Sequence, residues 1–171
     1  MRLTVLMEVD DPELAAALAE RLHAILDVEV EIIKTSLTNV EEALDSSRQQ
    51  FNAVTLLDIL QPSSEYTLLL TDRDLYVPGF NFVFGYAPGR KAVVSTRRLD
   101  PVQYGGKRDR KLYIARIVKE VVHEFGHMLG LSHCRTVGCV MNFSNTVYDV
   151  DRKQDVFCAK CMVKLSASMN R

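Results

Sequence analysis

The 171-residue sequence has no long apolar run, no excess of one charge and no cysteine before residue 134. Apolar runs such as residues 68–70 are far shorter than the roughly 18 residues that span a bilayer. Because 21 basic residues nearly balance 22 acidic ones, for a net charge of −1, no overall field attracts nucleic acid or an anionic membrane. We therefore expect neither nucleic acid nor a membrane among its partners.

The N-terminal residues also lack the continuous apolar region of a secretory signal, because Glu8 and Asp10 interrupt it, and we expect a cytoplasmic protein. Apolar residues make up 47% of the chain and charged residues 25%, as in ordinary globular proteins, which excludes intrinsic disorder. The length suits one domain, without internal repeats or flexible linkers. The oligomeric state stays open, with a monomer as the expectation.

The pattern of apolar residues predicts an α/β (α+β) fold with a mixed, twisted sheet. Strands are expected at residues 3–9, 28–34, 66–71, 80–86 and 91–96, with a tight turn at 87–89 between the last two. Helices are expected from about 12 to 26, brokenly from 38 to 60, from 109 to 129, and around 159–166. Thr38 and Glu41 have the spacing of a capping box at the start of the second helix. The third helix is the longest, and Gly130 directly follows it.

One segment reads HEFGHMLGLSH and matches the pattern H-E-x-x-H-x-x-G-x-x-H. Residues four apart in a helix lie one turn above each other, so His123 and His127 can bind the same metal ion. Gly130 allows a positive φ and a sharp turn, which brings His133 back as the third ligand. Three imidazoles and one open position suit a catalytic zinc, and Glu124 beside them is a candidate general base.

All four cysteines follow this motif, at Cys134, Cys139, Cys158 and Cys161, as C-x4-C and then C-x2-C. Four thiolates in two pairs suit a closed, tetrahedral, structural zinc site. Two alternatives stay open. The cysteines could form two disulfides, or Cys134 could be the fourth ligand of the histidine zinc, which would remove its open position. The favoured interpretation is two zinc ions per chain, one catalytic and one structural.

The histidine motif resembles that of the metzincin clan of zinc peptidases, in which a tight turn with a methionine lies under the metal. Met141, eight residues after His133, is similar to that methionine. Phe143 stands where some metzincins have a metal-binding tyrosine, so that role is absent. Within the clan, the sequence resembles the archaemetzincin family, which has a cysteine directly after the third histidine, another just before the methionine, and a C-x-x-C downstream. The resemblance covers about residues 65–165.

We therefore expect a single metallopeptidase domain, residues 1–171, with an upper subdomain (1–130) and a small, irregular lower one (131–171) built round the four-cysteine zinc. The resemblance implies that a peptide or protein substrate binds along an exposed edge strand, for which residues 81–86 and 91–96 are candidates. Glu124 would accept the proton of the attacking water and pass it to the leaving amine. Basic residues at 107–111 favour acidic substrates or form a solvated face.

The main alternative is a catalytically silent, zinc-binding protein on the same scaffold that recognises peptides without cleaving them. Glu124 argues against it, because a binding cage needs no general base. A zinc-ribbon interaction module, inferred from the cysteines alone, leaves the histidine motif unexplained. The sequence thus predicts a zinc-dependent peptidase and identifies neither its substrate nor its cleavage position.

Overall fold

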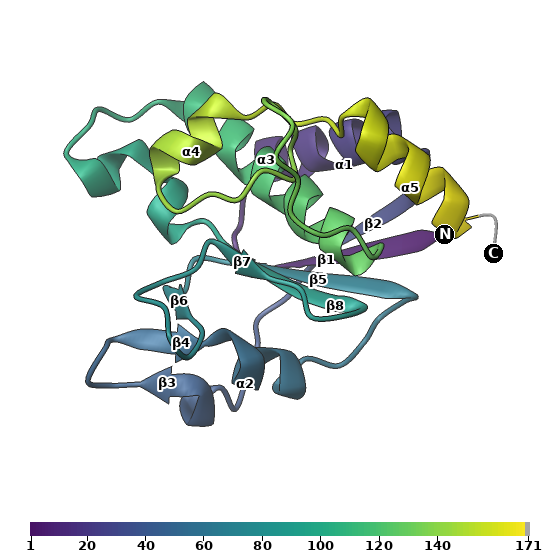
Figure 1. Cartoon of the computed structure of the whole chain (residues 1–171). Helices are drawn as coiled ribbons and strands as arrows, with labels where there is room; N and C mark the ends of the chain where they lie inside the picture. The colour runs from purple at the N-terminus through teal and green to yellow at the C-terminus, as the bar shows by residue number, and fades with distance from the viewer. Residues whose placement is uncertain (170–171) are drawn as a thin grey trace.

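The computed structural model describes residues 1–169, and a five-stranded sheet lies at its centre (Figure 1). Its strands, in the order in which they lie side by side, are β2 (Glu29–Lys34), β1 (Arg2–Met7), β5 (Tyr66–Thr71), β8 (Lys91–Ser95) and β7 (Gly85–Tyr86). The first four run parallel, and β7 is antiparallel to β8. Strands β1, β5 and β8 are buried along nearly their whole length, as expected for strands covered on both faces. The predicted mixed sheet is confirmed.

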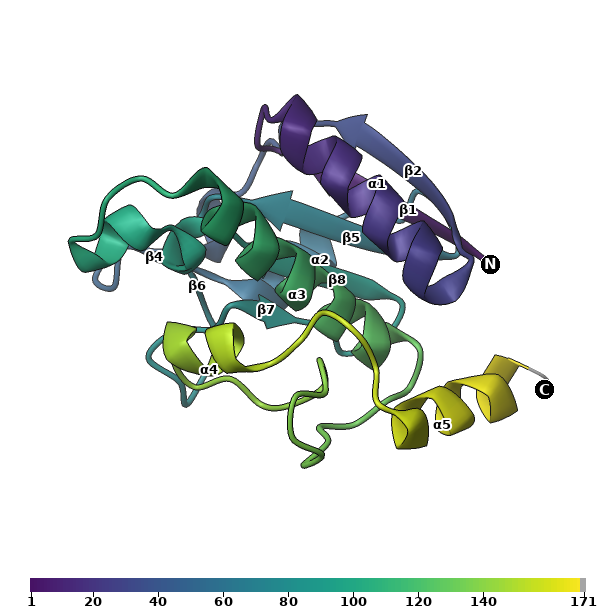
Figure 2. The ribbon, with the colours of Figure 1, turned by 90° about the horizontal axis from the view of Figure 1, so that it is seen from above.

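Helices cover both faces of this sheet. Helices α1 (Pro12–Leu26) and α3 (Arg110–Met128) lie on one face, and α2 (Ala53–Ile59) lies on the other (Figures 1 and 2). On β5, Leu68 and Leu70 belong to the core with α1 and α3, whereas Leu69 between them belongs to the core with α2. This alternation follows from the two-residue period of a strand. The sheet therefore separates two apolar cores.

Helix α1 begins where the sequence predicts. The Asp11 side chain accepts a hydrogen bond from the Leu14 N–H at 3.0 Å, and Pro12 fills a position that needs no donor. Every fourth residue of the helix is buried, namely Leu14, Leu18, Leu22 and Leu26. These leucines form the apolar stripe that fixes the helix on the sheet.

The broken helix predicted for residues 38–60 is wrong in its first half. A 3₁₀ turn (Glu41–Ala43) precedes a hairpin of β3 (Leu44–Asp45) and β4 (Gln50–Asn52), and only α2 is α-helical. The turn starts after Val40 without a side-chain cap, so Thr38 and Glu41 form no capping box. The Asp45 carboxylate accepts hydrogen bonds from the backbone N–H groups of Ser47 and Arg48, which closes a turn where a helix would continue. Strand β4 also pairs with β6 (Leu75–Tyr76) in a small three-stranded sheet.

The strand predicted at residues 80–86 is wrong except at its end, which is β7. Before β7, Val83 makes only an isolated bridge. The carbonyl oxygens of Phe80 and Asn81 accept hydrogen bonds from the Arg48 guanidinium at 2.7 and 3.1 Å. The Arg48 side chain therefore provides hydrogen bonds to this segment that a neighbouring strand would otherwise provide. Strands β7 and β8 are antiparallel neighbours, as predicted, but the tight turn at 87–89 is wrong, because Tyr86 pairs with Val93 and a longer loop joins them.

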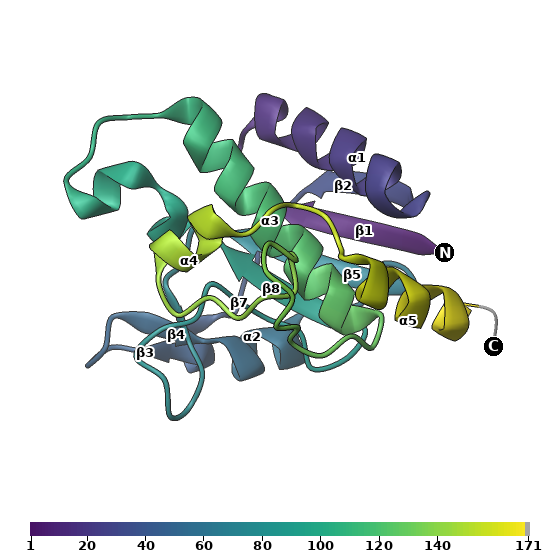
Figure 3. The ribbon, with the colours of Figure 1, turned by 45° about the horizontal axis from the view of Figure 1, so that its top comes forward.

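Two 3₁₀ turns (Arg97–Leu99 and Pro101–Tyr104) lead from β8 to α3, which confirms the helix predicted at 109–129. After α3, the chain returns along that helix and forms α4 (Val147–Arg152) and α5 (Ala159–Met169) (Figures 2 and 3). Val140, Met141, Val150 and Leu165 share the core of α1 and α3. The last helix is three residues longer than predicted. None of the helices within residues 1–169 is long and apolar enough to cross a membrane.

Candidate metal centres

The C-terminal end of α3 carries the histidines of the motif. His123 and His127 lie one turn apart, with their Nε2 atoms separated by 3.1 Å. Gly130 has a φ of +92°, and its N–H donates to the carbonyl of His127 at 2.9 Å. This glycine cap ends the helix and turns the chain, so that His133 returns to the other two rings. One ring nitrogen of each histidine lies within 4.8 Å of the others, so the three could hold one metal ion.

Hydrogen bonds orient two of these imidazoles. Nδ1 of His123 donates to the carbonyl of Val140, and Nδ1 of His127 donates to the carbonyl of Leu131, each at 2.7 Å. These bonds assign the proton to Nδ1 and leave Nε2 with the lone pair that a metal needs. Burial lowers the pKa of His123, His127 and His133 below the ordinary value. All three are therefore neutral at neutral pH, the form that binds metals.

Glu124 lies between the histidines and strand β7, with only 5% of its surface exposed. A Cβ on Gly85 would lie 2.6 Å from Oε1 of Glu124, so β7 approaches the carboxylate closely because residue 85 is glycine. Burial, followed by the charge of Glu120, raises the pKa of Glu124 well above its ordinary value, while Lys153 lowers it. A carboxyl with a raised pKa can accept and return a proton near neutral pH.

A hollow of about 310 Å³ opens over the three histidines and Glu124. Apolar and aromatic side chains form much of its lining, namely Val77, Phe80, Phe82, Phe84, Tyr86 and Phe143. Strand β7 lies at this hollow and at the edge of the five-stranded sheet. Of the two candidate edge strands for substrate, residues 91–96 do not form an edge, because β8 lies inside the sheet between β5 and β7. Residues 81–86 contribute only Gly85–Tyr86 as a strand.

Met141 lies against α3 with no exposed surface. A Cβ on Gly126 would overlap with Sδ of Met141, so the thioether packs directly on the helix backbone. Two residues later, the Phe143 ring packs edge-on against His133, with 5.2 Å between ring centroids. The methionine turn therefore packs against the histidine-bearing helix through Met141 and against His133 through Phe143.

Glu120 and Lys153 form a buried ion pair that no motif in the sequence indicates. Nζ of Lys153 lies 2.8 Å from Oε1 of Glu120, in a contact not directed as a hydrogen bond, and the side chains are 1% and 3% exposed. The same Nζ lies 3.3 Å from the carbonyl oxygen of Asn142 and 3.4 Å from Nδ1 of His123. Lys153 thus connects α3 to the methionine turn. Helical spacing is the one available signal, since Glu120 stands four residues before Glu124 on the same face.

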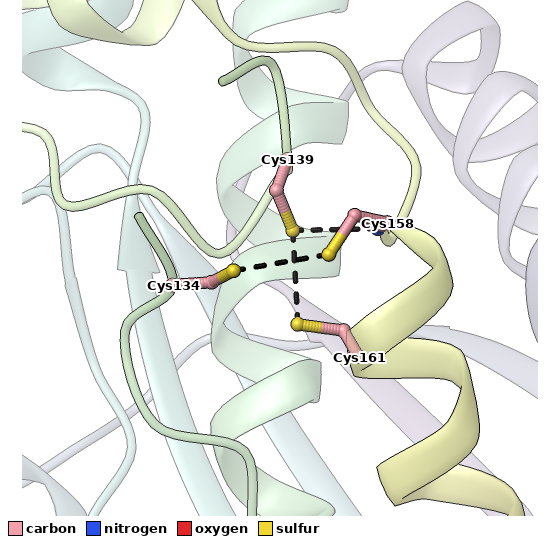
Figure 4. Close-up of side chains that lie close together, drawn as sticks. All are labelled: Cys134, Cys139, Cys158 and Cys161. Atoms are coloured by element: carbon pink, nitrogen blue, oxygen red, sulfur yellow. Dashed lines mark hydrogen bonds between the residues drawn. The ribbon is translucent and has the colours of Figure 1, made fainter. Parts of the chain in front are cut away.

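The cysteines converge from the loop after α3 and from the start of α5 (Figure 4). The Sγ atoms of Cys134 and Cys158 are 3.8 Å apart, as are those of Cys139 and Cys161, and all four lie within 4.8 Å. Thiolates about 2.3 Å from a tetrahedral zinc are about 3.8 Å from one another, whereas a disulfide requires about 2.05 Å. The geometry fits a four-thiolate metal site and does not fit disulfides. Cys134 belongs to this cluster and not to the histidine group.

Backbone N–H groups favour thiolates in this cluster. The N–H of Thr136 donates to Sγ of Cys134, and the N–H of Cys158 donates to Sγ of Cys139, both at 3.4 Å. A backbone hydrogen bond from Cys161 lowers the pKa of Cys158 to about 6. Burial raises the pKa of the Cys161 thiol, so this sulfur needs a cation nearby to ionise. A metal ion would supply that charge.

Known proteins are similar to this chain in sequence and in fold. Residues 19–167 match the sequence model of Peptidase family M54. The chain is 45% identical over 127 residues to an archaemetzincin of Saccharolobus islandicus, covering 72% of this chain and 69% of that protein. It is 46% identical over 149 residues to an archaemetzincin of Methanopyrus kandleri, covering 84% and 81%.

The fold of this chain is also similar to those of solved archaemetzincin structures. The fold is similar to the crystal structure of archaemetzincin from Archaeoglobus fulgidus complexed with malonate, with a TM-score of 0.83, 39% identity, and coverage of 96% of this chain and 99% of that one. The archaemetzincin structure from Methanopyrus kandleri gives a TM-score of 0.86 at 38% identity, with coverage of 100% and 96%. The chain therefore belongs to peptidase family M54, the archaemetzincins, and is a zinc metallopeptidase.

Proposed function

We propose that the protein hydrolyses peptide bonds in the hollow above His123, His127 and His133, which would hold the catalytic zinc. A zinc ion bound there supplies Lewis acidity and lowers the pKa of a water molecule toward about 7. The donors suit zinc, because all three imidazoles are neutral and two present Nε2 through their Nδ1 hydrogen bonds. Cys134 lies in the other cluster, which leaves the position for substrate open.

Glu124 is the proposed general base and acid. The observation that carries the proposal is its place: the carboxylate lines the same hollow as the histidines without belonging to their ligand group. Its raised pKa suits a group that takes the proton from the attacking water and delivers it to the leaving amine. A cage that only binds metal has no use for such a carboxylate.

Strand β7 is the proposed docking edge for the substrate. It pairs with β8 on one side only, and its residues Gly85 and Tyr86 line the hollow. An extended peptide would add main-chain hydrogen bonds at this edge. The phenylalanine side chains of the hollow favour apolar substrate residues beside the scissile bond.

The four cysteines are the proposed ligands of a second, structural zinc. This ion would join Cys134 and Cys139, which flank the loop after His133, to Cys158 and Cys161 at the start of α5. Metal analysis should therefore give two zinc ions per chain, and a mild chelator should remove the histidine-bound ion first, because a closed thiolate site offers no open position. A single zinc, or joint loss of both ions without unfolding, contradicts this division.

The test of the catalytic proposal is Glu124→Gln in zinc-loaded protein, measured by mass spectrometry on a diverse peptide library. Cleavage should fall by roughly 10²- to 10⁴-fold, the range for a lost general acid–base group, with unchanged zinc content. The exposed Glu42→Gln is the matched control and should cleave like the wild type.

Three outcomes decide the assignment. If Glu124→Gln loses its zinc, the residue is part of the metal cage. If it cleaves at the wild-type rate, the role of Glu124 is wrong. If the wild type binds zinc and peptides but cleaves none, the catalytically silent alternative is correct.

A further inference from the structure

A second hollow, of about 570 Å³, lies apart from the histidines. Four arginines and two aspartates are prominent in its lining, namely Arg48, Arg73, Arg97, Arg98, Asp72 and Asp74. Residues 72–74 directly follow β5, and residues 97–98 follow β8 by one residue, so the hollow lies at the carboxyl ends of two parallel strands. Ligands of open parallel sheets bind outside this edge. The proposed peptidase chemistry uses none of these residues.

Two of the arginines are already neutralised. Arg73 contacts Glu8 through Nε and Nη2, each at 3.1 Å. Arg98 contacts Asp74 through Nε and Nη2, each at 2.8 Å. In such two-pronged pairs the charges cancel and the side chains become rigid, so Arg73 and Arg98 are fixed parts of the lining.

Arg48 and Arg97 are different, because both are exposed and neither forms an ion pair with a carboxylate within residues 1–169. Nε of Arg97 donates to the carbonyl of Asp72 at 2.8 Å, and Arg48 donates to two backbone carbonyls and one side-chain amide. Arg48 keeps the N–H groups of Nη1 for a ligand, and Arg97 keeps those of both Nη atoms. After the charge of the Asp72 carboxylate is counted, the hollow keeps an excess of positive charge.

We propose that this arginine hollow binds a small oxyanion, a phosphate or carboxylate group, with Arg48 and Arg97 as its main contacts. The planar guanidinium fork of Arg97 matches both groups, and Arg48 adds the two N–H groups of its Nη1. Arg73 and Arg98, locked by their partners, give the hollow its shape. The site shares no residue with the metal ligands or with the hollow above them.

Occupancy of this site would affect the neighbouring hollow. Arg48 holds the carbonyls of Phe80 and Asn81, and the Arg98 guanidinium stacks on the Phe82 ring at 4.3 Å. Phe80 and Phe82 line the hollow above the histidines. One short segment thus separates the two hollows, and arginines of the first hold it in place. An anion that fixes Arg48 would also fix this wall.

The experiment is a titration of zinc-loaded, ¹⁵N-labelled protein with inorganic phosphate at constant ionic strength, followed by backbone amide shifts. We expect saturable binding at one site, with shifts at residues 72–74, 80–82 and 97–99. Arg97→Gln and Arg48→Gln should each weaken binding at least tenfold. Both residues are exposed, so the variants should fold, and Arg97→Gln is the decisive variant because Arg48 also holds the carbonyls of Phe80 and Asn81. Lys107→Gln removes the same charge from an exposed position outside the hollow and should bind like the wild type.

A parallel titration with succinate identifies the preferred group, since either saturable response at these residues supports the site. The proposal is overturned if neither anion saturates, or if Lys107→Gln weakens binding as much as Arg97→Gln does. It is also overturned if the shifts lie only around His123, His127 and His133 and persist in Arg97→Gln, because the anion would then bind at the zinc.

Discussion

At the scale of single residues, the absence of a side chain at Gly85 leaves the space that the Glu124 carboxylate occupies. A Cβ at residue 85 would lie 2.6 Å from Oε1 and 2.7 Å from Cγ of Glu124. Gly85→Ala should therefore displace the carboxylate or β7 and lower kcat by about 10²-fold, the usual cost of a misplacement of about 1 Å. Zinc content should not change. The check is steady-state kinetics with metal analysis.

Gly89→Ala is the matched control, because it lies in the same hairpin and its added Cβ would meet no atom within 4 Å. Equal losses in both variants would show that the hairpin, and not the contact with Glu124, is sensitive. Full activity in Gly85→Ala would show that Glu124 tolerates displacement, which contradicts its proposed role.

The ion pair between Lys153 and Glu120 is buried, so the two charges depend on each other. Lys153→Met leaves the Glu120 carboxylate buried without a compensating charge, so unfolding free energy should fall by about 3–5 kcal/mol. The double variant Lys153→Met, Glu120→Leu should lose much less, because neither charge remains in the core. Urea unfolding of the two single variants and the double variant measures the coupling. Additive losses would mean that the two side chains do not act as a pair.

The histidine motif could be predicted from sequence because its spacing fixes the geometry: four residues make one helical turn, and Gly130 makes the return. Lys153 could not be predicted in this way. It stands in the polar stretch DRKQD, where a lysine is ordinarily solvated, and its buried partner lies 33 residues earlier. Only tertiary packing brings the two charges together.

At the scale of elements, α5 matters because Cys158 directly precedes it and Cys161 lies in its first turn. Cys161→Ser replaces a soft thiolate by a hydroxyl, and a structural zinc contributes its binding free energy to the fold. In a chain of this size, a loss of 1 kcal/mol in unfolding free energy lowers the melting temperature by roughly 2–4 °C. We expect Cys161→Ser to lower it by more than that. Zinc at the histidines should also bind more weakly, because the same cluster fixes the loop after His133.

Val163→Ser, two residues further along α5 and 69% exposed, is the control for Cys161→Ser and should melt within about 2 °C of the wild type. Scanning calorimetry and zinc titration with a competing chelator measure the two effects. A Cys161→Ser variant that melts like the wild type and retains both metals would show that this cysteine is not a ligand.

Elements differ in how far the sequence determines them. Helices α1 and α3 could be predicted because caps and long periodic stripes define them. The segments at 38–60 and 80–86 could not, since strands of two or three residues have too little periodicity. Their conformation depends on single side chains, namely the Asp45 turn and the Arg48 contacts with two carbonyls. The cysteine cluster was predictable as a set, but not the backbone donors that support it.

At the scale of the whole molecule, burial of the histidines makes the stability of the metal-free fold depend on pH. Burial lowers the pKa of His123 and His127, so the unfolded chain binds more protons than the folded one once the pH falls below about 6.5. Glu124 acts in the opposite direction, because its raised pKa lets the folded chain bind the extra proton. In the chelator-treated Glu124→Gln variant, which removes this effect, stability should therefore decrease as the pH falls from 7.5 to 5.5. Urea unfolding at the two values measures it, and adding His123→Asn to this variant should make the decrease smaller.

The order of the ligands along the chain has a consequence for synthesis. The parallel strands of the main sheet end at residue 95, whereas all the candidate metal ligands lie between residues 123 and 161. These strands therefore leave the ribosome before any ligand does, and the face of the sheet that α3 covers is completed when that helix follows. His133 leaves the ribosome well before Cys158 and Cys161, which are needed to fix its loop. A nascent chain would thus acquire its hydrolytic centre last, which shortens the time in which an unfinished peptidase can cleave its neighbours.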